Sequence, residues 1–179
     1  MSIEAEPSSR NPTVFGRILD GSLPATVVEE TDSLLAFHDI APASENHVLV
    51  IPKRQIAHPG ALTPADLPLL RDMVEAAERI ARARGVADVR AAREAGTLSL
   101  GFHLWPCLSV YHLHLHLIFP MPARSCIARL KFPQAYASYY VPPEAVAERF
   151  CGAALVHGDV PYSSEEPRAS RVACAWFRL

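Results

Sequence analysis

The sequence has few cysteines, and none of them stand at the spacing of a metal site. The four are scattered, at Cys107, Cys126, Cys151 and Cys174. Without a C-x-x-C pair, this distribution argues against a structural zinc module and gives no disulfide framework. Reduced thiols in an intracellular compartment are the simplest interpretation. We therefore expect a cytoplasmic protein, with the nucleus as an alternative location.

Long apolar runs and a strong net charge are also lacking. No apolar run approaches the length of a membrane span. Residues 1–11 have neither the apolar core nor the basic charge of a secretory signal or a transit peptide. The net charge of −2 gives no general attraction to nucleic acid or to an anionic membrane. We expect neither a membrane nor a nucleic acid among the partners.

What is present is an ordinary globular composition, with 50% of the 179 residues hydrophobic and 20% charged. Apolar or β-branched segments predict five strands, over 25–30, 34–38, 47–52, 97–103 and 109–119. A short helix is predicted over 13–20, and a long one from the capping residues Thr63-Pro64 to Arg84, before Gly85. This pattern indicates an α+β fold.

The composition divides the chain into four parts. Residues 1–11 are polar, and we expect them to form a flexible N-terminus. Residues 12–122 hold the predicted sheet and long helix. Residues 123–151 are expected to form a C-terminal extension that packs on this domain, with a helix from Pro142 to Phe150. Residues 152–179 form a tail that is expected to be partly disordered.

The most distinctive stretch is a row of histidines. Histidine alternates with leucine from His112 to Leu117, and an apolar run continues to Phe119. A period of two is typical of a strand with one buried face. His112, His114 and His116 are then expected to project from one face of the strand, while the leucines point into the core.

Three interpretations of this histidine face are open. A solvated edge strand would normally carry Thr, Lys, Glu or Ser instead. A metal site is limited by distance, because alternate residues lie about 6.6 Å apart but the outer pair lies about 13 Å apart, too far for one zinc ion to reach all three. A third ligand would have to come from elsewhere. Chemistry at phosphorus suits a row of imidazoles, which supplies a nucleophile, hydrogen-bond donors and cationic partners for phosphate oxygens. We favour this third interpretation.

The H-φ-H-φ-H-φ-φ pattern over 112–118 resembles the histidine-triad (HIT) family of nucleotide hydrolases and transferases. Further segments resemble the N-terminal half of that family in order and spacing: Phe15-Gly16-Arg17-Ile18, Pro24-Ala25, Leu35 to Ile40 and His47 to Lys53. The resemblance covers about residues 12–120. It lies in the Hint-type branch, closest in motif form to the divergent third Hint subgroup. It implies a HIT-like fold, namely a five-stranded antiparallel sheet with one long helix and one short N-terminal helix.

The resemblance implies catalytic roles for five residues. His114 corresponds to the nucleophile that attacks the α-phosphorus of a nucleotide. His112 and His116 flank it and hold its orientation or the phosphoryl oxygens, and His47 corresponds to the family's fourth histidine. Ser109 corresponds to a serine that contacts the phosphate and helps to protonate an amine leaving group. The plainer alternatives are a satisfied buried histidine for His47 and a turn serine for Ser109.

The ordinary pKa of histidine sets a pH expectation for this chemistry. Only the neutral ring attacks, so activity is expected to fall below about pH 6.

The same resemblance implies a nucleotide site. Four residues correspond to an apolar slot for the purine: Phe15, Ile18, Phe37 and Ile40. Ordinary core packing is the alternative for them. Asp39 corresponds to a carboxylate that accepts hydrogen bonds from the ribose hydroxyls, with a turn-initiating aspartate as the alternative. His38 lies in the same motif and is included among the nucleotide-binding residues.

The function that the resemblance implies is hydrolysis of purine nucleoside 5′-phosphoramidates through a nucleotidyl-histidine, an adenosine 5′-monophosphoramidase type of reaction that needs no cofactor and no metal. The expected substrate is a purine nucleotide such as an AMP–amine conjugate, and the expected assembly is a homodimer. A dinucleoside polyphosphate hydrolase and a nucleotide-binding interaction module with little turnover are the alternatives. The second is kept because residues 101–108 differ from the Asn- and Gly-rich stretch of the commonest Hint enzymes.

Overall fold

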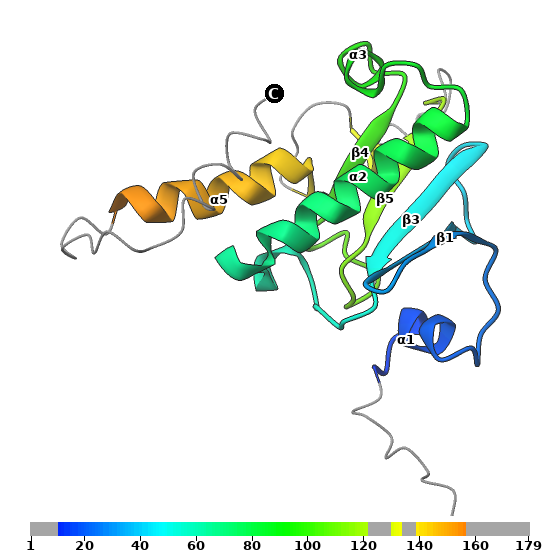
Figure 1. The fold of residues 1–179 in the computed structure, drawn as a ribbon, viewed down its shortest axis with the longest axis horizontal. Helices are drawn as coiled ribbons and strands as arrows, with labels where there is room; N and C mark the ends of the chain where they lie inside the picture. The colour runs from blue at the N-terminus through cyan, green and yellow to red at the C-terminus, as the bar shows by residue number, and fades with distance from the viewer. Residues whose placement is uncertain (1–10, 122–129, 134–138, 157–179) are drawn as a thin grey trace, which may run out of the picture.

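The computed structural model describes residues 11–121, 130–133 and 139–156, and their side chains up to residue 150. An antiparallel sheet carries one long helix, α2, on one face, with shorter helices around it (Figure 1). The predicted α+β class is confirmed. Most of the predicted flexible N-terminus and all but the first few residues of the predicted tail lie outside the described residues.

The sheet has six strands, one more than predicted, in the order β1-β2-β3-β5-β4-β6. Their bounds are Val27–Glu30 (β1), Leu34–His38 (β2), Asn46–Pro52 (β3), Ser99–His103 (β4), Leu115–Phe119 (β5) and Tyr140–Val141 (β6). The additional strand, β6, pairs with the outer edge of β4. Two residues are too few to show an alternating pattern, so this strand gives no signal in the sequence.

The strand that carries the histidine row is shorter than predicted. It begins at Leu115 and not near Ser109. Before it, the backbone N–H of Leu113 donates to the carbonyl oxygen of Ile56 at 2.6 Å. This part of the chain therefore pairs with the loop after β3 and not with a neighbouring strand, although its side chains keep alternating.

The register sorts the side chains onto two faces. His116 lies opposite Leu49 on β3 and opposite Gly101 on β4. Because directly opposed residues share a face, one face carries the odd-numbered residues of β3 and β4 together with the even-numbered residues of β5. His47 and His103 therefore lie on the same face as His116, and the leucines of β5 lie on the other.

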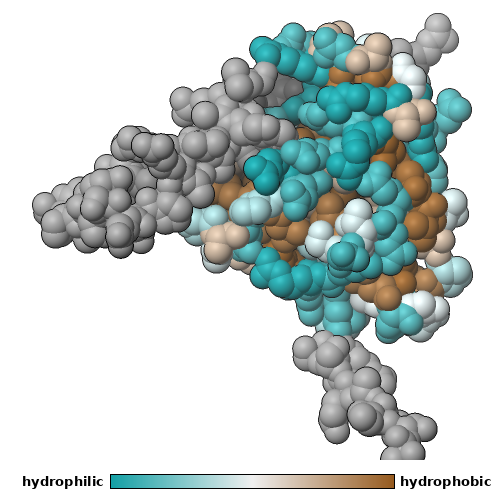
Figure 2. Space-filling view, in the orientation of Figure 1, coloured by the Kyte–Doolittle hydropathy of each residue, from teal (hydrophilic) through white to brown (hydrophobic). Residues whose placement is uncertain are grey.

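Helix α2, Leu67–Ala83, covers the leucine face. A 3-10 turn, Pro64–Asp66, precedes it, and Thr63 and Asp66 form a capping box there, as the predicted helix start requires. The predicted apolar stripe is buried: Leu67, Leu70, Val74, Ala77, Ile80 and Ala81. The face of the molecule seen in Figure 2 mixes hydrophilic and apolar side chains.

Shorter elements surround this core. Helix α1, Val14–Leu19, begins at Thr13, whose hydroxyl accepts a hydrogen bond from the N–H of Gly16. A 3-10 turn, Pro59–Ala61, and helix α3, Val89–Glu94, lie on either side of α2 in the chain. Helix α5, Pro143–Val156, forms where a helix to Phe150 was predicted, and it contacts α2 and β4 (Figure 1).

The extension is tied to the rest of the chain by charge. Arg93 of α3 donates two hydrogen bonds, of 2.6 and 2.9 Å, to the carboxylate of Glu144 in α5. A bidentate pair of this kind fixes geometry as well as contributing energy. Among the helices that the structure describes, none is both long enough and apolar enough to cross a membrane.

The α2 stripe gives a first prediction. Leu70 is 1% exposed, and Leu70→Ala is expected to lower the free energy of unfolding by about 2–5 kcal/mol, because a cavity opens between α2 and the sheet. Urea unfolding at pH 7.5 measures this loss. Arg71→Ala, one residue further on the exposed side, is the control and should change stability by less than about 0.5 kcal/mol. Equal losses for the two variants would contradict this assignment of the core.

Candidate active site

The histidine row is buried on the face of the sheet opposite α2. His112, His114 and His116 are 0%, 4% and 5% exposed. His116 lies in β5, and the other two continue the same alternation in the preceding segment. The structure therefore brings the three predicted histidines to one side of the chain.

His114 has one nitrogen held and one free. Its Nδ1–H donates to the carbonyl oxygen of His112 at 2.7 Å, which leaves the lone pair on Nε2. Among the described residues, Nε2 takes part in no hydrogen bond. Every fully buried side-chain nitrogen or oxygen among them does have a hydrogen-bond partner. Nε2 is therefore not fully buried, and it is the atom of this ring that can act as a nucleophile.

Burial sets the charge of His114. Removal from water lowers its pKa to about 4, with smaller contributions from the neighbouring imidazoles of His103 and His112, while the hydrogen bond to the His112 carbonyl acts in the opposite direction. The ring is therefore neutral at pH 7. The expectation that activity falls below about pH 6 took the pKa of an ordinary histidine, and the lowered pKa of His114 moves this expectation to a lower pH.

A second set of imidazoles forms a hydrogen-bonded chain. The N–H of Ala43 donates to Nδ1 of His47 at 3.0 Å, and Nε2 of His47 lies 2.9 Å from Nδ1 of His116. Nε2 of His116 lies 3.0 Å from Nδ1 of His103, whose Nε2 lies 2.8 Å from the carbonyl oxygen of Lys131. The structure thus brings His47 to the row, and His103 joins it as well. Burial lowers the pKa of each of these three rings.

His112 is held from the N-terminal side. Its Nε2–H donates to the carbonyl oxygen of Pro52 at 2.8 Å, and its Nδ1 lies 2.5 Å from the side-chain nitrogen of Asn11. Burial lowers the pKa of His112 too. A Cβ on Gly16 would lie 2.2 Å from the carbonyl oxygen of Asn11, so the glycine of the F-G-R-I motif makes room for this contact. Sequence reasoning did not single out Asn11.

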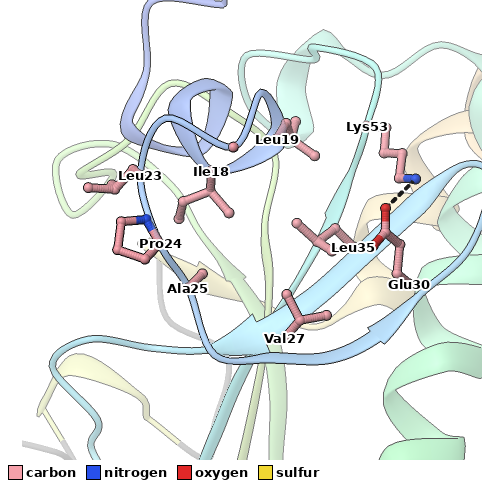
Figure 3. Close-up of a pocket in the computed structure, with 10 residues that line it drawn as sticks. Ile18, Leu19, Leu23, Pro24, Ala25, Val27, Glu30, Leu35 and Lys53 are labelled. Carbon is pink, nitrogen blue, oxygen red and sulfur yellow. Dashed lines mark ion pairs between the residues drawn. The ribbon is translucent and has the colours of Figure 1, made fainter.

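One predicted purine-slot residue, Phe15, lies beside His114, and a second, Phe37, lies beside Phe15. The Phe15 ring centroid is 5.2 Å from that of His114 and 5.5 Å from that of Phe37. Ile18, one turn further along α1, lines a cavity of about 520 Å³ between α1 and strands β1 and β2 (Figure 3). Helix α1 therefore contacts the histidine row at one end and the cavity at the other. The fourth predicted residue, Ile40, is fully exposed and does not join them.

The remaining predicted residues are distributed around the row. An oxygen of Asp39 lies 3.5 Å from Nε2 of His47, at the edge of the hydrogen-bonded chain. His38 points to the α2 side, where a guanidinium nitrogen of Arg84 lies 3.0 Å from its Nε2, so its side chain is not brought to the triad. Ser109 is exposed in the loop between β4 and β5.

The spacing of the imidazoles bears on metal binding. One ring nitrogen from each of His103, His114 and His116 lies within 4.8 Å of the other two. His103 is therefore placed as the third ligand that a metal site would need besides two histidines of the row. In the structure, however, both nitrogens of His103 and of His116 take part in hydrogen bonds. Any ion would have to displace these bonds, and a site that works without metal stays our prediction.

The lowered pKa values give a second prediction, for stability against pH. Five histidines have a folded pKa below 6.5: His47, His103, His112, His114 and His116. Between pH 6.5 and about 4 the unfolded chain binds more protons than the folded one, so the free energy of unfolding falls as the pH falls through this window and is constant with respect to these groups above it.

Urea unfolding at half-unit steps from pH 7.5 to 5 measures that slope, which is about 1.4 kcal/mol per pH unit for each proton taken up. We expect a slope that corresponds to more than one proton, and a smaller one in His116→Gln. Leu130→Ala, at an exposed side chain that does not titrate, should leave the slope unchanged. A flat profile in the wild-type chain would contradict the assignment of neutral buried rings.

Comparison with known proteins agrees with this geometry. A family model described as "Scavenger mRNA decapping enzyme C-term binding" matches residues 12–131. A protein of Danio rerio named adenosine 5′-monophosphoramidase HINT3 is 36% identical over 94 residues, which are 52% of this chain and 55% of that protein. The chain thus spans about half the length of that relative. Adenylylsulfatase HINT1 of Arabidopsis thaliana is 35% identical over 120 residues, 65% of this chain and 76% of its own.

Among solved structures, a HIT family hydrolase from Clostridium thermocellum superposes with a TM-score of 0.55 at 30% identity, over 65% of this chain and 96% of its own. The likeness extends over nearly the whole of that structure. Together with the buried histidine row and the family model, it shows that the chain belongs to the histidine-triad family.

Proposed function

We propose that this chain hydrolyses purine nucleoside 5′-phosphoramidates through a covalent nucleotidyl-histidine on His114. This reaction belongs to the general class of nucleotide hydrolases of the phosphoramidase type. The observation that carries the proposal is the free Nε2 of His114, opposite an Nδ1–H that donates to the His112 carbonyl. The names of the HINT3 and HINT1 relatives support it.

The reaction has two displacements. In the first, the Nε2 lone pair of His114 forms a bond to the α-phosphorus, the P–N bond of the substrate breaks, and the amine takes up a proton from water as it leaves. In the second, a water oxygen attacks the same phosphorus and gives up a proton to the solvent, the bond from phosphorus to Nε2 breaks with its electron pair returning to Nε2, and AMP is released. The ring carries positive charge while Nε2 is bonded to phosphorus, and the His112 carbonyl, 2.7 Å from Nδ1, stabilises that charge.

In this proposal the nucleotide runs along α1. The phosphate lies at His114, Asp39 accepts hydrogen bonds from the ribose, and the base passes Phe15 and Phe37 toward the cavity lined by Ile18. Most residues that line the cavity are apolar, but polar atoms supply about half of its surface, and Lys53 and Glu30 are paired there at 2.7 Å (Figure 3). Apolar side chains beside a few polar groups suit a ligand that has both an apolar face and polar atoms.

Ser109 is assigned to the leaving group. It stands on the exposed loop between β4 and β5, where an amine could depart into water. A hydroxyl near the departing nitrogen eases the protonation that cleavage of a P–N bond requires.

One observation favours the alternative of a nucleotide-binding module with little turnover. His114 is only 4% exposed, so the reactive nitrogen presents little surface to an incoming phosphate. Adduct formation separates a slow enzyme from a binder, because a binder holds AMP without a covalent bond.

The adduct gives the third prediction. Mixing the chain with an adenosine 5′-phosphoramidate and quenching in the first turnover is expected to add the mass of one AMP unit to the protein, on a peptide that contains His114. His114→Ala should lose the adduct, and His58→Ala should keep it. Intact-protein mass spectrometry, with calorimetry of AMP binding alongside, measures both. Tight AMP binding with no adduct in the wild-type chain would leave the binding module as the function.

The pKa of His114 gives the fourth prediction. With a value of about 4, the ring stays neutral through mild acid, so kcat/KM for the phosphoramidate is expected to stay level from pH 8 to about 5 and to fall only near pH 4. Circular dichroism at each pH checks that the chain is still folded. A half-maximal rate near pH 6.5 would show that the nucleophile is not held in this buried environment.

A further inference from the structure

His103 stands where it can control a member of the triad. It ends β4, two residues after Gly101, which lies opposite His116. The two imidazole rings have centroids 4.6 Å apart, and Nδ1 of His103 is 3.0 Å from Nε2 of His116. His116 in turn lies beside the nucleophile, with its ring centroid 4.9 Å from that of His114.

The protons of the His47–His116–His103 chain can be placed from its two ends. At one end a backbone N–H, that of Ala43, can only donate, so Nδ1 of His47 must accept and its proton is on Nε2. At the other end the carbonyl of Lys131 can only accept, so Nε2 of His103 must carry a proton. With all three rings neutral, each has one donor and one acceptor, and only one arrangement satisfies every bond.

That arrangement commits both nitrogens of His116. Its Nδ1 accepts from His47 and its Nε2–H donates to His103. Without an acceptor at the position of His103, the Nε2–H of a fully buried ring would lose its partner, which is costly. The ring would then rotate or change tautomer to recover a bond, and its position beside the nucleophile would be lost.

Residues 130–133, which follow β5 in the chain, contact His103 through Lys131 and Phe132. Besides the Lys131 carbonyl, the ring of Phe132 lies 5.2, 5.0 and 5.1 Å from the rings of His47, His103 and His116. A single aromatic side chain therefore covers the whole chain of imidazoles. Its buried position, together with the carbonyl of the residue before it, makes this segment part of the site.

Strand β6 completes the support. The Tyr140 ring lies 5.1 Å from that of His103, and its hydroxyl lies 2.9 Å from that of Ser99. A Cβ on Gly101 would lie 2.6 Å from this ring, so glycine at 101 leaves the space that Tyr140 fills. The N–H of Leu104, next to His103, donates to the carbonyl of Tyr139 at 2.7 Å.

We propose that His103 is a positioning residue for the hydrolase reaction: it fixes the tautomer and orientation of His116, and the Lys131 carbonyl and the Phe132 ring hold it in place. The inference rests on the proposed function for its kinetic consequence. Its structural consequence, the tautomer of His116, does not depend on that function.

Two substitutions at His103 separate the hydrogen bond from simple packing. His103→Phe fills the space but removes the acceptor, and His103→Asn returns an acceptor near the position of Nδ1. We expect the single-turnover rate of adduct formation to fall about tenfold or more in His103→Phe, with KM changed less than about twofold, and to recover most of the loss in His103→Asn. Equal rates in both variants, or a change in KM alone, would overturn the proposal.

A second pair of variants tests whether residues 130–133 support His103. Phe132→Ala is expected to lower the same rate, and Leu130→Ala, two residues away and 71% exposed, to leave it unchanged. An unchanged rate in Phe132→Ala would remove the segment from the proposal.

Nitrogen NMR of histidine-labelled protein supplies the readout that does not need turnover. The wild-type chain should show His116 with its proton on Nε2, and His103→Phe should change that signal while the other folded resonances remain. If the wild-type chain forms no adduct but shows this tautomer, the hydrolase function fails, and only the assignment that His103 fixes the tautomer of His116 stands. A proton on Nδ1 of His116 in the wild-type chain would refute the positioning role, whatever the activity.

Discussion

A buried imidazole must be neutral and must have a partner for its N–H, and this requirement organises the site. Burial lowers the pKa of all five rings on the histidine face. Their protons are then placed by what surrounds them, and much of that is backbone: the carbonyls of Pro52, His112 and Lys131 accept, and the N–H of Ala43 donates. Backbone groups cannot exchange roles as imidazoles can, so they determine the tautomer of every ring in contact with them.

The arrangement is possible because the two faces of the sheet carry different side chains, leucines on one and histidines on the other. Helix α2 and the leucines of β5 bury the apolar face and supply most of the core. The opposite face can then carry polar rings without weakening the core, provided that each is paired. Burial of these rings costs stability in acid, because the unfolded chain takes up protons that the neutral folded rings do not. The same neutrality keeps a nucleophile available at neutral pH, so the feature that limits stability in acid is also the one that suits the chemistry.

The sequence predicts what depends on side-chain pattern and misses what depends on backbone partners. The stripe of α2 and the shared face of His112, His114 and His116 follow from periodicity, the helix start at Thr63 follows from residue type, and the structure has all three. The pairing of His103 with Lys131 does not follow, because a carbonyl oxygen is present at every residue and gives no signal. Asn11 was missed for another reason, because nothing in the sequence links its side chain to a histidine 101 residues further along the chain. Strand β6 has only two residues, which are too few for any pattern. The expected acid limit changes because the pKa of His114 depends on its burial, which the residue type alone does not reveal.

Nε2 of His114 is an exception to the pairing of the imidazole nitrogens on this face. In a face where the described imidazoles have their other nitrogens paired, Nε2 of His114 has no hydrogen-bond partner among the described residues and is not fully buried. A protein that pairs every neighbouring donor and acceptor has no structural reason to leave this lone pair unused, and a partner there would block any bond to phosphorus. The hydrogen bond from His116 to His103 has the same effect, because it gives the Nε2–H of His116 a partner. His116 therefore needs no hydrogen bond to His114. The nitrogen that we propose as the nucleophile is thus the one that the surrounding hydrogen bonds leave without a partner among the described residues.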